Sequence, residues 1–223
     1  MENFLEKLAP TIFVKLLEHL QLTFIASFLA ILIAVPFGIL LTRLKSESIS
    51  NLILRILSTV QTIPGLALMA MIIVFLAFIR PIASLPTTGF FPAVLVLVIY
   101  SFLPILSNTY TGIKQVNPSM VEVARAMGMR ESQILFWVEV PLSLPVLITG
   151  IRVSIVWTIS LVTLTSLIGS GGLGDLIVQG LRTMQMDLVL AGTIPAAVLA
   201  IIFDFCIAKA GKWLAPIENL RRI

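Results

Sequence analysis

Charged residues are scarce in this sequence, and their scarcity decides which solvent it faces. Only 12% of its 223 residues are Asp, Glu, Lys or Arg, against about 25% in an ordinary soluble domain. The hydrophobic share is 58% and the mean hydropathy is +1.08. This number of charges is too small to cover a water-facing surface. Most of the chain must therefore face lipid. The net charge of +4 comes from basic residues between apolar runs rather than on one face, which argues against nucleic-acid binding.

Side chains that carry out chemistry are also few. The single cysteine, Cys206, excludes an internal disulfide framework, and its place in an apolar run predicts a buried thiol. The single histidine, His19, is expected at a helix end near the outer interface, with no function assigned to it. Paired carboxylates, a metal-ligand cluster and a Ser/His arrangement are missing from the sequence. A membrane-embedded catalyst is therefore disfavoured, and we expect no catalytic residue and no metal.

Two kinds of binding motif are missing as well. The chain has no G-x-x-x-x-G-K-[ST] loop, so it cannot cradle the phosphates of ATP. An aromatic cage of the kind that binds quaternary ammonium ions is not predicted either, because the three Trp and two Tyr residues are scattered. We expect no cofactor in this chain.

Five segments are apolar and long enough to cross a bilayer, which takes about 20 residues. They cover residues 20–41, 52–79, 90–108, 142–168 and 188–210. The opening stretch "MENFLEKLAPTIFVKLLEHL" leads into the first of them and has the spacing of an amphipathic helix. The expected fold is an all-α membrane protein with about five transmembrane helices. It forms one domain over 1–223, with a membrane core at 19–210 and a cytoplasmic loop at 111–141.

The basic residues between the spans predict the orientation, because Lys and Arg accumulate on the cytoplasmic side. With the N-terminus outside, ten basic residues lie inside: Arg43, Lys45, Arg55, Lys114, Arg125, Arg130, Lys209, Lys212, Arg221 and Arg222. Four lie outside: Lys7, Lys15, Arg80 and Arg182. This asymmetry predicts an outer N-terminus and a cytoplasmic C-terminus.

The loop between the third and fourth spans holds the charged stretch "MVEVARAMGMRESQILFWVEVP". A helix is predicted to start at Asn117-Pro118 or, on capping-box spacing, at Ser119. Gly128 then separates it from a second short helix, "RESQILFWVEV", that ends at Pro141. Spacing alone leaves two interpretations open: an interfacial helix pair that only tethers two spans, or a docking site for a partner.

A family resemblance appears at these residues. Glu122-Val123-Ala124, Gly128 and the later Val138, Val140 and Pro141 look like the E-A-A-x-x-x-G-x9-I-x-L-P loop of bacterial ABC importer permeases. Val123 replaces the first alanine, and valines replace the Ile and Leu. The resemblance implies that this loop is a coupling helix seated in a cytoplasmic ATPase subunit. It implies ATPase-coupling roles for Glu122, Ala124, Arg125, Gly128 and Pro141.

Further stretches resemble one branch of these permeases, which serves osmoprotectants such as glycine betaine, carnitine and choline. They are "VPFGILLTR", "VQTIPGLALMA", "YSFLPILSNTYTGI", "VNPSMVEVARAMGM", "VPLSLPVLITGIR" and "SLIGSGGLGDLI". The common form of that branch has Arg where Ser107 stands, a departure that bears on the substrate.

The resemblance implies a type I importer permease in the bacterial plasma (inner) membrane. Its implied partners are two cytoplasmic ABC ATPases that hold ATP and Mg, an extracytoplasmic substrate-binding protein, and a second permease copy or paralogue. An amino acid such as methionine, or a thiol betaine such as ergothioneine, is the alternative cargo. A channel or secondary transporter that works without an ATPase is the alternative class. Against it, the sequence has no inverted repeat and no acidic ion-coupling cluster.

Polar residues inside the spans are the candidates for a translocation path. The stretch from Gln61 through Thr62 to Pro64 and Gly65 should break the second span, since Pro removes a backbone donor. Such breaks are tolerated where they line a cavity or are buried in protein, although a simple packing kink is the alternative. Tyr100 and Asn108 on the third span are further candidates.

Two more features call for an explanation. The stretch "GSGGLGD" contains Gly169, Gly171, Gly172 and Gly174 at the outer end of the fourth span. It is predicted to form part of an outer gate or of the binding-protein contact, with a plain re-entrant turn as the alternative. Charged residues inside a membrane usually face the bundle interior and pair, so Arg152 and Asp204 are predicted to pair with each other. Pairing in a second permease copy and snorkelling are the alternatives.

Overall fold

The computed structural model describes residues 2 to 214, and over this range every regular element is a helix. The elements are α1 (Glu2–Thr42), α2 (Glu47–Gln61), α3 (Gly65–Ile79), α4 (Phe90–Lys114), α5 (Pro118–Ala126), α6 (Glu131–Ile134), the π-helical η1 (Leu135–Glu139), α7 (Val140–Thr165), the 3-10 turn η2 (Ser166–Ile168), α8 (Gly174–Thr183) and α9 (Met186–Leu214). The predicted all-α class is confirmed. Of the predicted charge sets, Arg221, Arg222 and the side chain of Lys7 lie outside what the structure describes.

Four helical segments are long and apolar enough to cross a membrane, and α2 with α3 makes a fifth, bent one. The helix predicted before the first span is present, and it continues into that span. No Gly or Pro interrupts the chain between residues 11 and 35, so α1 continues unbroken from Glu2 to Thr42. His19 therefore lies inside α1 and is fully buried, not at a helix end.

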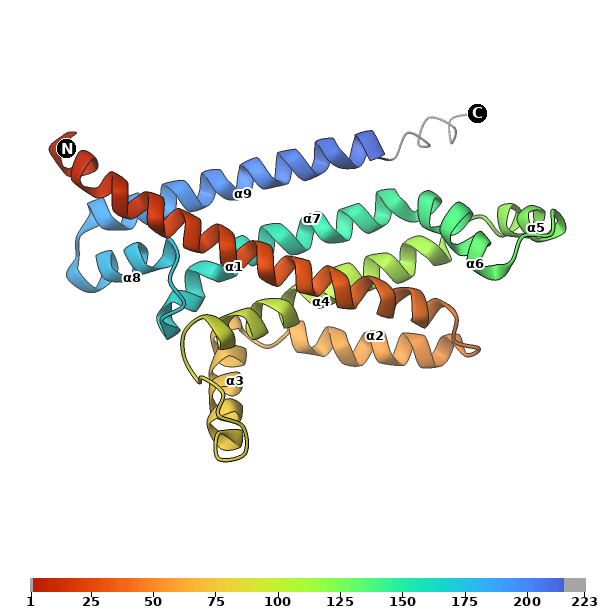
Figure 1. Ribbon diagram of the computed structural model, residues 1–223, viewed down its shortest axis with the longest axis horizontal. Helices are drawn as coiled ribbons and strands as arrows, with labels where there is room; N and C mark the ends of the chain where they lie inside the picture. The colour runs from red at the N-terminus through yellow and green to blue at the C-terminus, as the bar shows by residue number, and fades with distance from the viewer. Residues whose placement is uncertain (1, 215–223) are drawn as a thin grey trace.

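The core forms where α1, α4 and α7 run side by side (Figure 1). Ala26, Ala30 and Ala34 repeat every fourth residue on α1 and are completely buried. At Gly150 of α7, a β-carbon would lie 2.5 Å from the β-carbon of Asn108 on α4. Small residues of this kind let helix backbones approach closely in a membrane, where no hydrophobic force drives helices together.

Hydrogen bonds between helices add to this packing. The hydroxyl groups of Ser101 on α4 and Thr158 on α7 lie 2.6 Å apart, and the Ser154 hydroxyl donates to the carbonyl of Ser101 at 3.0 Å. α9 packs mainly on α7 and α8. Its Cys206 faces outward and is exposed, so the prediction of a buried thiol is wrong.

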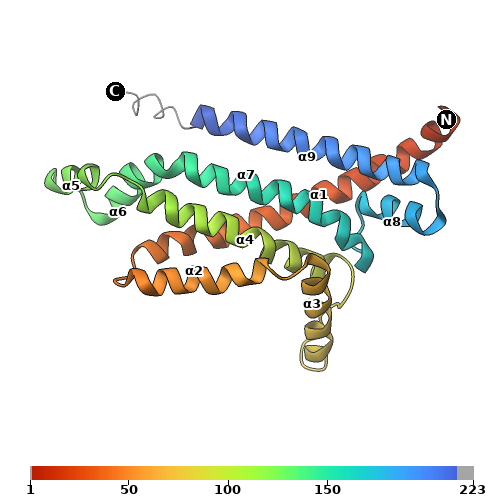
Figure 2. The same ribbon diagram turned by 180° about the vertical axis from the view of Figure 1, so that it is seen from behind.

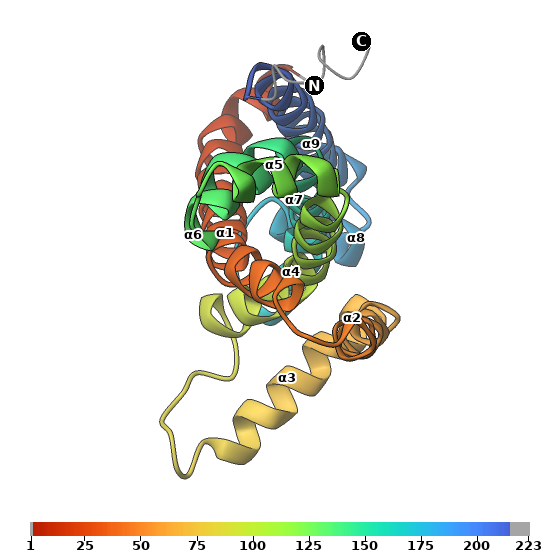
Figure 3. The ribbon, with the colours of Figure 1, turned by 90° about the vertical axis from the view of Figure 1, so that its right-hand side faces the viewer.

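The predicted break in the second span is confirmed. α2 and α3 meet at an angle of 98° at residues 62 to 64. α3 therefore leaves the bundle, whereas α2 stays at its edge (Figure 3). The short helices between the spans lie at two opposite ends of the molecule (Figures 1 and 2). α5 and α6 lie at one end with the last described turn of α9, and α8 lies at the other end with the start of α1.

Candidate functional site

The inner loop, residues 111 to 141, starts with a capped helix. The Asn117 side-chain oxygen accepts a hydrogen bond from the backbone N–H of Ser119 at 3.0 Å, and Pro118 is the first residue of α5. The predicted start at Asn117-Pro118 is confirmed, and the alternative start at Ser119 is wrong. The chain then turns at Gly128, whose φ of +80° is a left-handed conformation that glycine adopts without strain.

The second half of the inner loop differs from the prediction. The helix that begins at Glu131 does not end at Pro141, because α6, η1 and α7 form one continuous helical segment. Pro141 is in the first turn of α7, where its missing N–H is not needed. Leu135–Glu139 forms a π-helical bulge in this segment, a feature that often occurs at functional sites.

An apolar stripe is the most exposed hydrophobic feature of α5. Met120, Val123 and Met127 are 53%, 58% and 76% exposed and follow the i, i+3, i+7 spacing of one helix face. More than half of each side chain stays exposed, which is typical of a surface that a partner buries. The sequence analysis overlooked this stripe, although the spacing was available.

Ion pairs fix the inner loop to the bundle. Arg43, just after α1, forms a bidentate pair with Glu139 at the end of η1, with 3.2 Å between Nη1 and Oε1. Glu139 is only 6% exposed. Across the Gly128 turn, Arg125 Nε donates to Glu131 Oε1 at 2.9 Å. This hydrogen bond raises the pKa of the Arg125 guanidinium above its ordinary value.

The predicted ATPase-coupling residues divide by exposure. Glu122, Arg125 and Gly128 are exposed, Pro141 is half-buried, and Ala124 is 3% exposed and packs inside the chain. Arg125 is already engaged with Glu131, whereas Glu122 has no ion pair with any side chain of residues 8 to 214. A β-carbon on Gly128 would meet nothing within 4 Å. Glu122 and Gly128 are thus the members of the set best placed to meet a partner.

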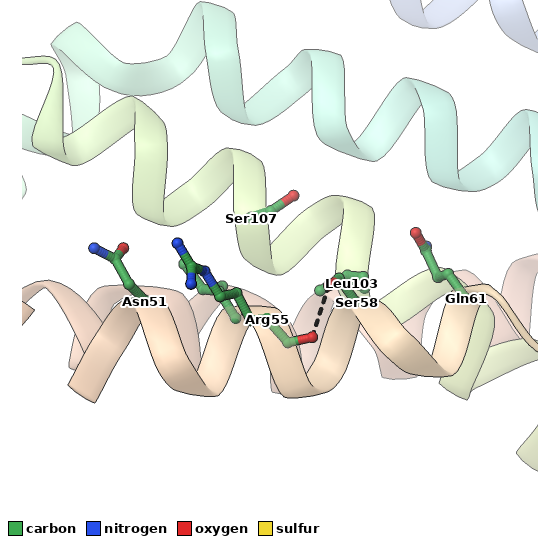
Figure 4. A pocket seen from close by; sticks show the side chains of 7 residues that line it. Asn51, Arg55, Ser58, Gln61, Leu103 and Ser107 are labelled. Atoms are coloured by element: carbon green, nitrogen blue, oxygen red, sulfur yellow. Dashed lines mark hydrogen bonds between the residues drawn. The ribbon is translucent and has the colours of Figure 1, made fainter. Parts of the chain in front are cut away.

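A polar cavity of about 600 Å³ lies between α2 and α4 (Figure 4). Its lining residues are Asn51, Leu54, Arg55, Ser58 and Gln61 from α2 and Leu103 and Ser107 from α4. Among the predicted path residues, only Gln61 lines it. From the sequence, Arg55 is predicted only as one of the basic residues on the cytoplasmic side, near the start of the second span.

The other predicted path residues lie elsewhere. The Tyr100 hydroxyl donates to the carbonyl of Ile63 and so braces the break between α2 and α3. Thr62 and Pro64 are exposed in that break. The Asn108 amide donates to the Pro104 carbonyl at 2.8 Å, and its β-carbon faces Gly150 of α7. These positions place Tyr100 and Asn108 in helix packing, away from the cavity.

The glycine loop, residues 169 to 174, is held to α1 at the opposite end of the molecule. Gly169, Gly171 and Gly172 all have positive φ. The N–H of Gly172 donates to Glu18 Oε2 at 2.8 Å. Lys15 bridges Glu18 at 2.9 Å and Asp175 at 2.7 Å. The loop is thus a junction between α1, α7 and α8, and its role as a gate stays a prediction.

Arg152 and Asp204 lie together. Nε and Nη2 of Arg152 donate to the two carboxylate oxygens of Asp204 at 2.5 Å and 2.6 Å. The pair joins α7 to α9, within segments apolar enough to span the membrane. Both side chains are about 40% exposed, so lipid or a second subunit meets the pair on one side.

We expect reversal of either charge to reduce the amount of folded protein in the membrane to a small fraction of wild type. Arg152→Asp or Asp204→Arg places like charges side by side, and charges inside a membrane are tolerated mainly as pairs. The double variant restores the pair in reverse and should recover most of the loss. Fluorescence size-exclusion chromatography of solubilised membranes measures this. A double variant no better than the worse single variant would count against a pair that locks α7 to α9.

Comparison with known proteins identifies relatives over most of the chain. Residues 34 to 216 match the family described as "binding-protein-dependent transport system inner membrane component". The chain is 40% identical to the carnitine transport permease protein OpuCB of Listeria monocytogenes, over 96% of this chain and 93% of that protein. It is 39% identical to the glycine betaine/carnitine/choline transport system permease protein OpuCB of Bacillus subtilis, over 97% and 94%.

Among solved structures, the fold resembles a chain of the MetNI methionine ABC transporter in an inward-facing conformation. The TM-score is 0.79, the identity is 20%, and the match covers 94% of this chain and 98% of that one. At this identity the likeness supports the fold alone. The arrangement of helices is therefore that of a type I importer permease, as predicted.

Proposed function

This chain belongs to the binding-protein-dependent transport system inner membrane component family, and on that premise we propose that it is the membrane subunit of an ATP-driven osmoprotectant importer. Its cargo is a quaternary ammonium compound such as glycine betaine, carnitine or choline. The names of relatives near 40% identity, which cover nearly the whole chain, support this cargo class. The chain itself performs no catalysis.

The observation that carries the proposal is the exposed apolar stripe on α5. Met120, Val123 and Met127 form a knob at the end of the molecule, and the loop behind it is anchored on both sides by α4 and by the continuous α6–α7 segment. Because both ends of the loop continue into membrane helices, a displacement of α5 moves those helices as a rigid body. Because the sequence has no phosphate-binding loop, the energy for this displacement comes from a separate ATPase.

The importer then contains two cytoplasmic ABC ATPases, a second permease copy or paralogue, and an extracytoplasmic binding protein. ATP and Mg bind to the ATPases, whose closure brings the two α5 knobs together. That movement opens the outer mouth, which takes substrate from the docked binding protein, and hydrolysis resets the path inward. Five spans rarely enclose a path alone, which supports a second permease subunit around the cavity.

The N-terminus lies outside the cell and the C-terminus in the cytoplasm under this proposal. The inner loop, the α1–α2 connection and the last described turn of α9 share one end of the molecule (Figure 1). Arg43, Lys45, Lys114, Arg130 and Lys212 belong to these segments, as the positive-inside rule requires. The glycine loop lies at the opposite end, where the binding protein would dock.

Reconstitution of the complete importer in liposomes tests this function. ATP-dependent uptake of labelled glycine betaine, carnitine or choline is expected, and it should stop when the phosphate-loop lysine of the ATPase is replaced. Competition by methionine or ergothioneine rather than by these compounds would assign the alternative cargo. Uptake that persists without any ATPase would overturn the importer and indicate a channel or secondary transporter.

A further inference from the structure

Helix α2 has three different faces. Ile53, Leu54 and Leu57 pack against the cluster between α1 and α4. A second face is apolar and exposed and carries Ile49, Leu52 and Ile56. The third face carries Asn51, Arg55 and Ser58, which follow i, i+4, i+7 spacing and line the cavity against α4.

The position of Arg55 on that third face is unusual. It lies two turns into a helix that forms half of a membrane span, and an arginine in lipid is strongly unfavourable. Among the side chains that the structure describes, those of residues 8 to 214, no acidic one pairs with it. Since the exposed apolar face already provides the contact with lipid, the Arg55 face must border water or a second subunit.

The lining of the cavity defines what fits there. Its described lining contains no carboxylate and no aromatic side chain, so the guanidinium of Arg55 is its only charge. Asn51, Gln61 and Ser107 add neutral hydrogen-bonding groups. Figure 4 shows Arg55 on the side of α2 that faces α4, with Ser107 across the gap. The Ser58 hydroxyl donates to the Arg55 carbonyl at 2.7 Å, so it does not occupy the guanidinium.

We propose that this cavity is a weak binding site for small molecules that carry a carboxylate, with Arg55 as the group that binds it. The inference rests on the proposed function for the identity of the cargo. Guanidinium and carboxylate fit each other as a two-bond fork, and the volume is in the range of small-ligand pockets, about 300–1,000 Å³. Without an aromatic cage the ammonium end is held only loosely, so substrate can leave.

This site separates two kinds of osmoprotectant. Glycine betaine and carnitine carry a carboxylate, whereas choline is a cation with a hydroxyl group. Arg55 attracts the first kind and repels the second, so discrimination comes from an attractive and a repulsive element together. The permease therefore favours zwitterions over choline, independently of the binding protein.

Ligand titration by NMR tests this on the assembled importer in nanodiscs without its binding protein. Glycine betaine and acetate are expected to bind at millimolar concentration, and choline about tenfold more weakly or not at all. Arg55→Gln should weaken the two carboxylates by about tenfold, and Arg55→Lys should weaken them less because it keeps the charge. Lys209→Gln removes an equal charge from α9, across the bundle from α2, and should leave binding unchanged.

A second variant tests the site without changing Arg55, in case Arg55→Gln misfolds. Ser107→Asp brings a carboxylate of the protein's own to face Arg55 and should abolish acetate binding while Arg55 is intact. Equal affinity for choline and glycine betaine in wild type, or binding unchanged in Arg55→Gln, would overturn the site.

Liposome uptake distinguishes a failure of this binding site from a failure of the proposed function. Import of glycine betaine without carboxylate binding refutes only this site, and import of an amino acid refutes only the cargo.

Discussion

Arg43→Gln is expected to remove most of the substrate-stimulated ATP hydrolysis of the assembled importer, and Arg43→Gln combined with Glu139→Gln to recover much of it. Glu139 is 6% exposed, and Arg43 is its partner in a two-bond pair. Removal of one member of a buried pair costs about 3–5 kcal/mol, because the other charge stays buried and uncompensated. The side chain of Arg43 is 39% exposed, so solvent screening places the loss near the lower end, about 3 kcal/mol.

This loss should reach the ATPase because of where Glu139 lies. It is the last residue of η1, the bulge through which α6 continues into α7. An unpaired carboxylate there moves toward water and shifts the junction on which the inner loop is mounted. The double variant leaves two neutral groups that can hydrogen-bond to each other, so the loop regains its position.

Lys114→Gln is the matched control for this prediction. Lys114 forms the neighbouring pair with Glu47 at 2.8 Å, but that pair is exposed to solvent, with Glu47 73% exposed. Exposed pairs contribute about 0–1 kcal/mol, so stimulated hydrolysis and the melting temperature should change little. Equal effects of Arg43→Gln and Lys114→Gln would show that the buried pair has no special role in coupling.

The sequence predicted features that depend on neighbouring residues. The span break at Pro64 and the Asn117 cap are encoded within a few positions, because a missing N–H and a capping oxygen act locally. The pair of Arg152 and Asp204 was accessible for another reason. Two opposite charges inside otherwise apolar spans have few alternative partners.

Features that join distant segments were not predictable in this way. Glu18 accepts its hydrogen bond from Gly172, which is 154 residues away. The cavity needs the register of α2 against α4, which no local pattern specifies. The glycine-rich stretch predicts an outer gate or a binding-protein contact, with a re-entrant turn as the alternative, but it does not predict helix α8, which begins at Gly174. Pro141 was taken as a helix end, although proline is equally suited to a first helical turn.

Gly128→Trp is expected to leave the protein inserted and folded, yet to lower substrate-stimulated ATP hydrolysis at least about tenfold, which is a loss near 1.4 kcal/mol of productive contact. The φ of Gly128 is +80°, so a side chain other than that of Asn or Asp adds strain of roughly 1–2 kcal/mol. In this chain alone a β-carbon there meets nothing within 4 Å. The first atom of a side chain at this position therefore has open space in the isolated subunit, and we expect the indole to clash only with a partner seated against the turn.

A graded series separates strain from obstruction. Gly128→Asn keeps the left-handed turn at little strain and should retain most of the coupling, and Gly128→Ala adds strain without bulk and should be intermediate. Only Gly128→Trp fills the space beside the Met120, Val123 and Met127 stripe. If Gly128→Trp hydrolyses ATP as well as Gly128→Ala under substrate stimulation, no partner occupies that space, and α5 does not dock on the ATPase in the proposed way. A graded loss from Asn through Ala to Trp, with equal membrane insertion, places the turn inside the contact that drives transport.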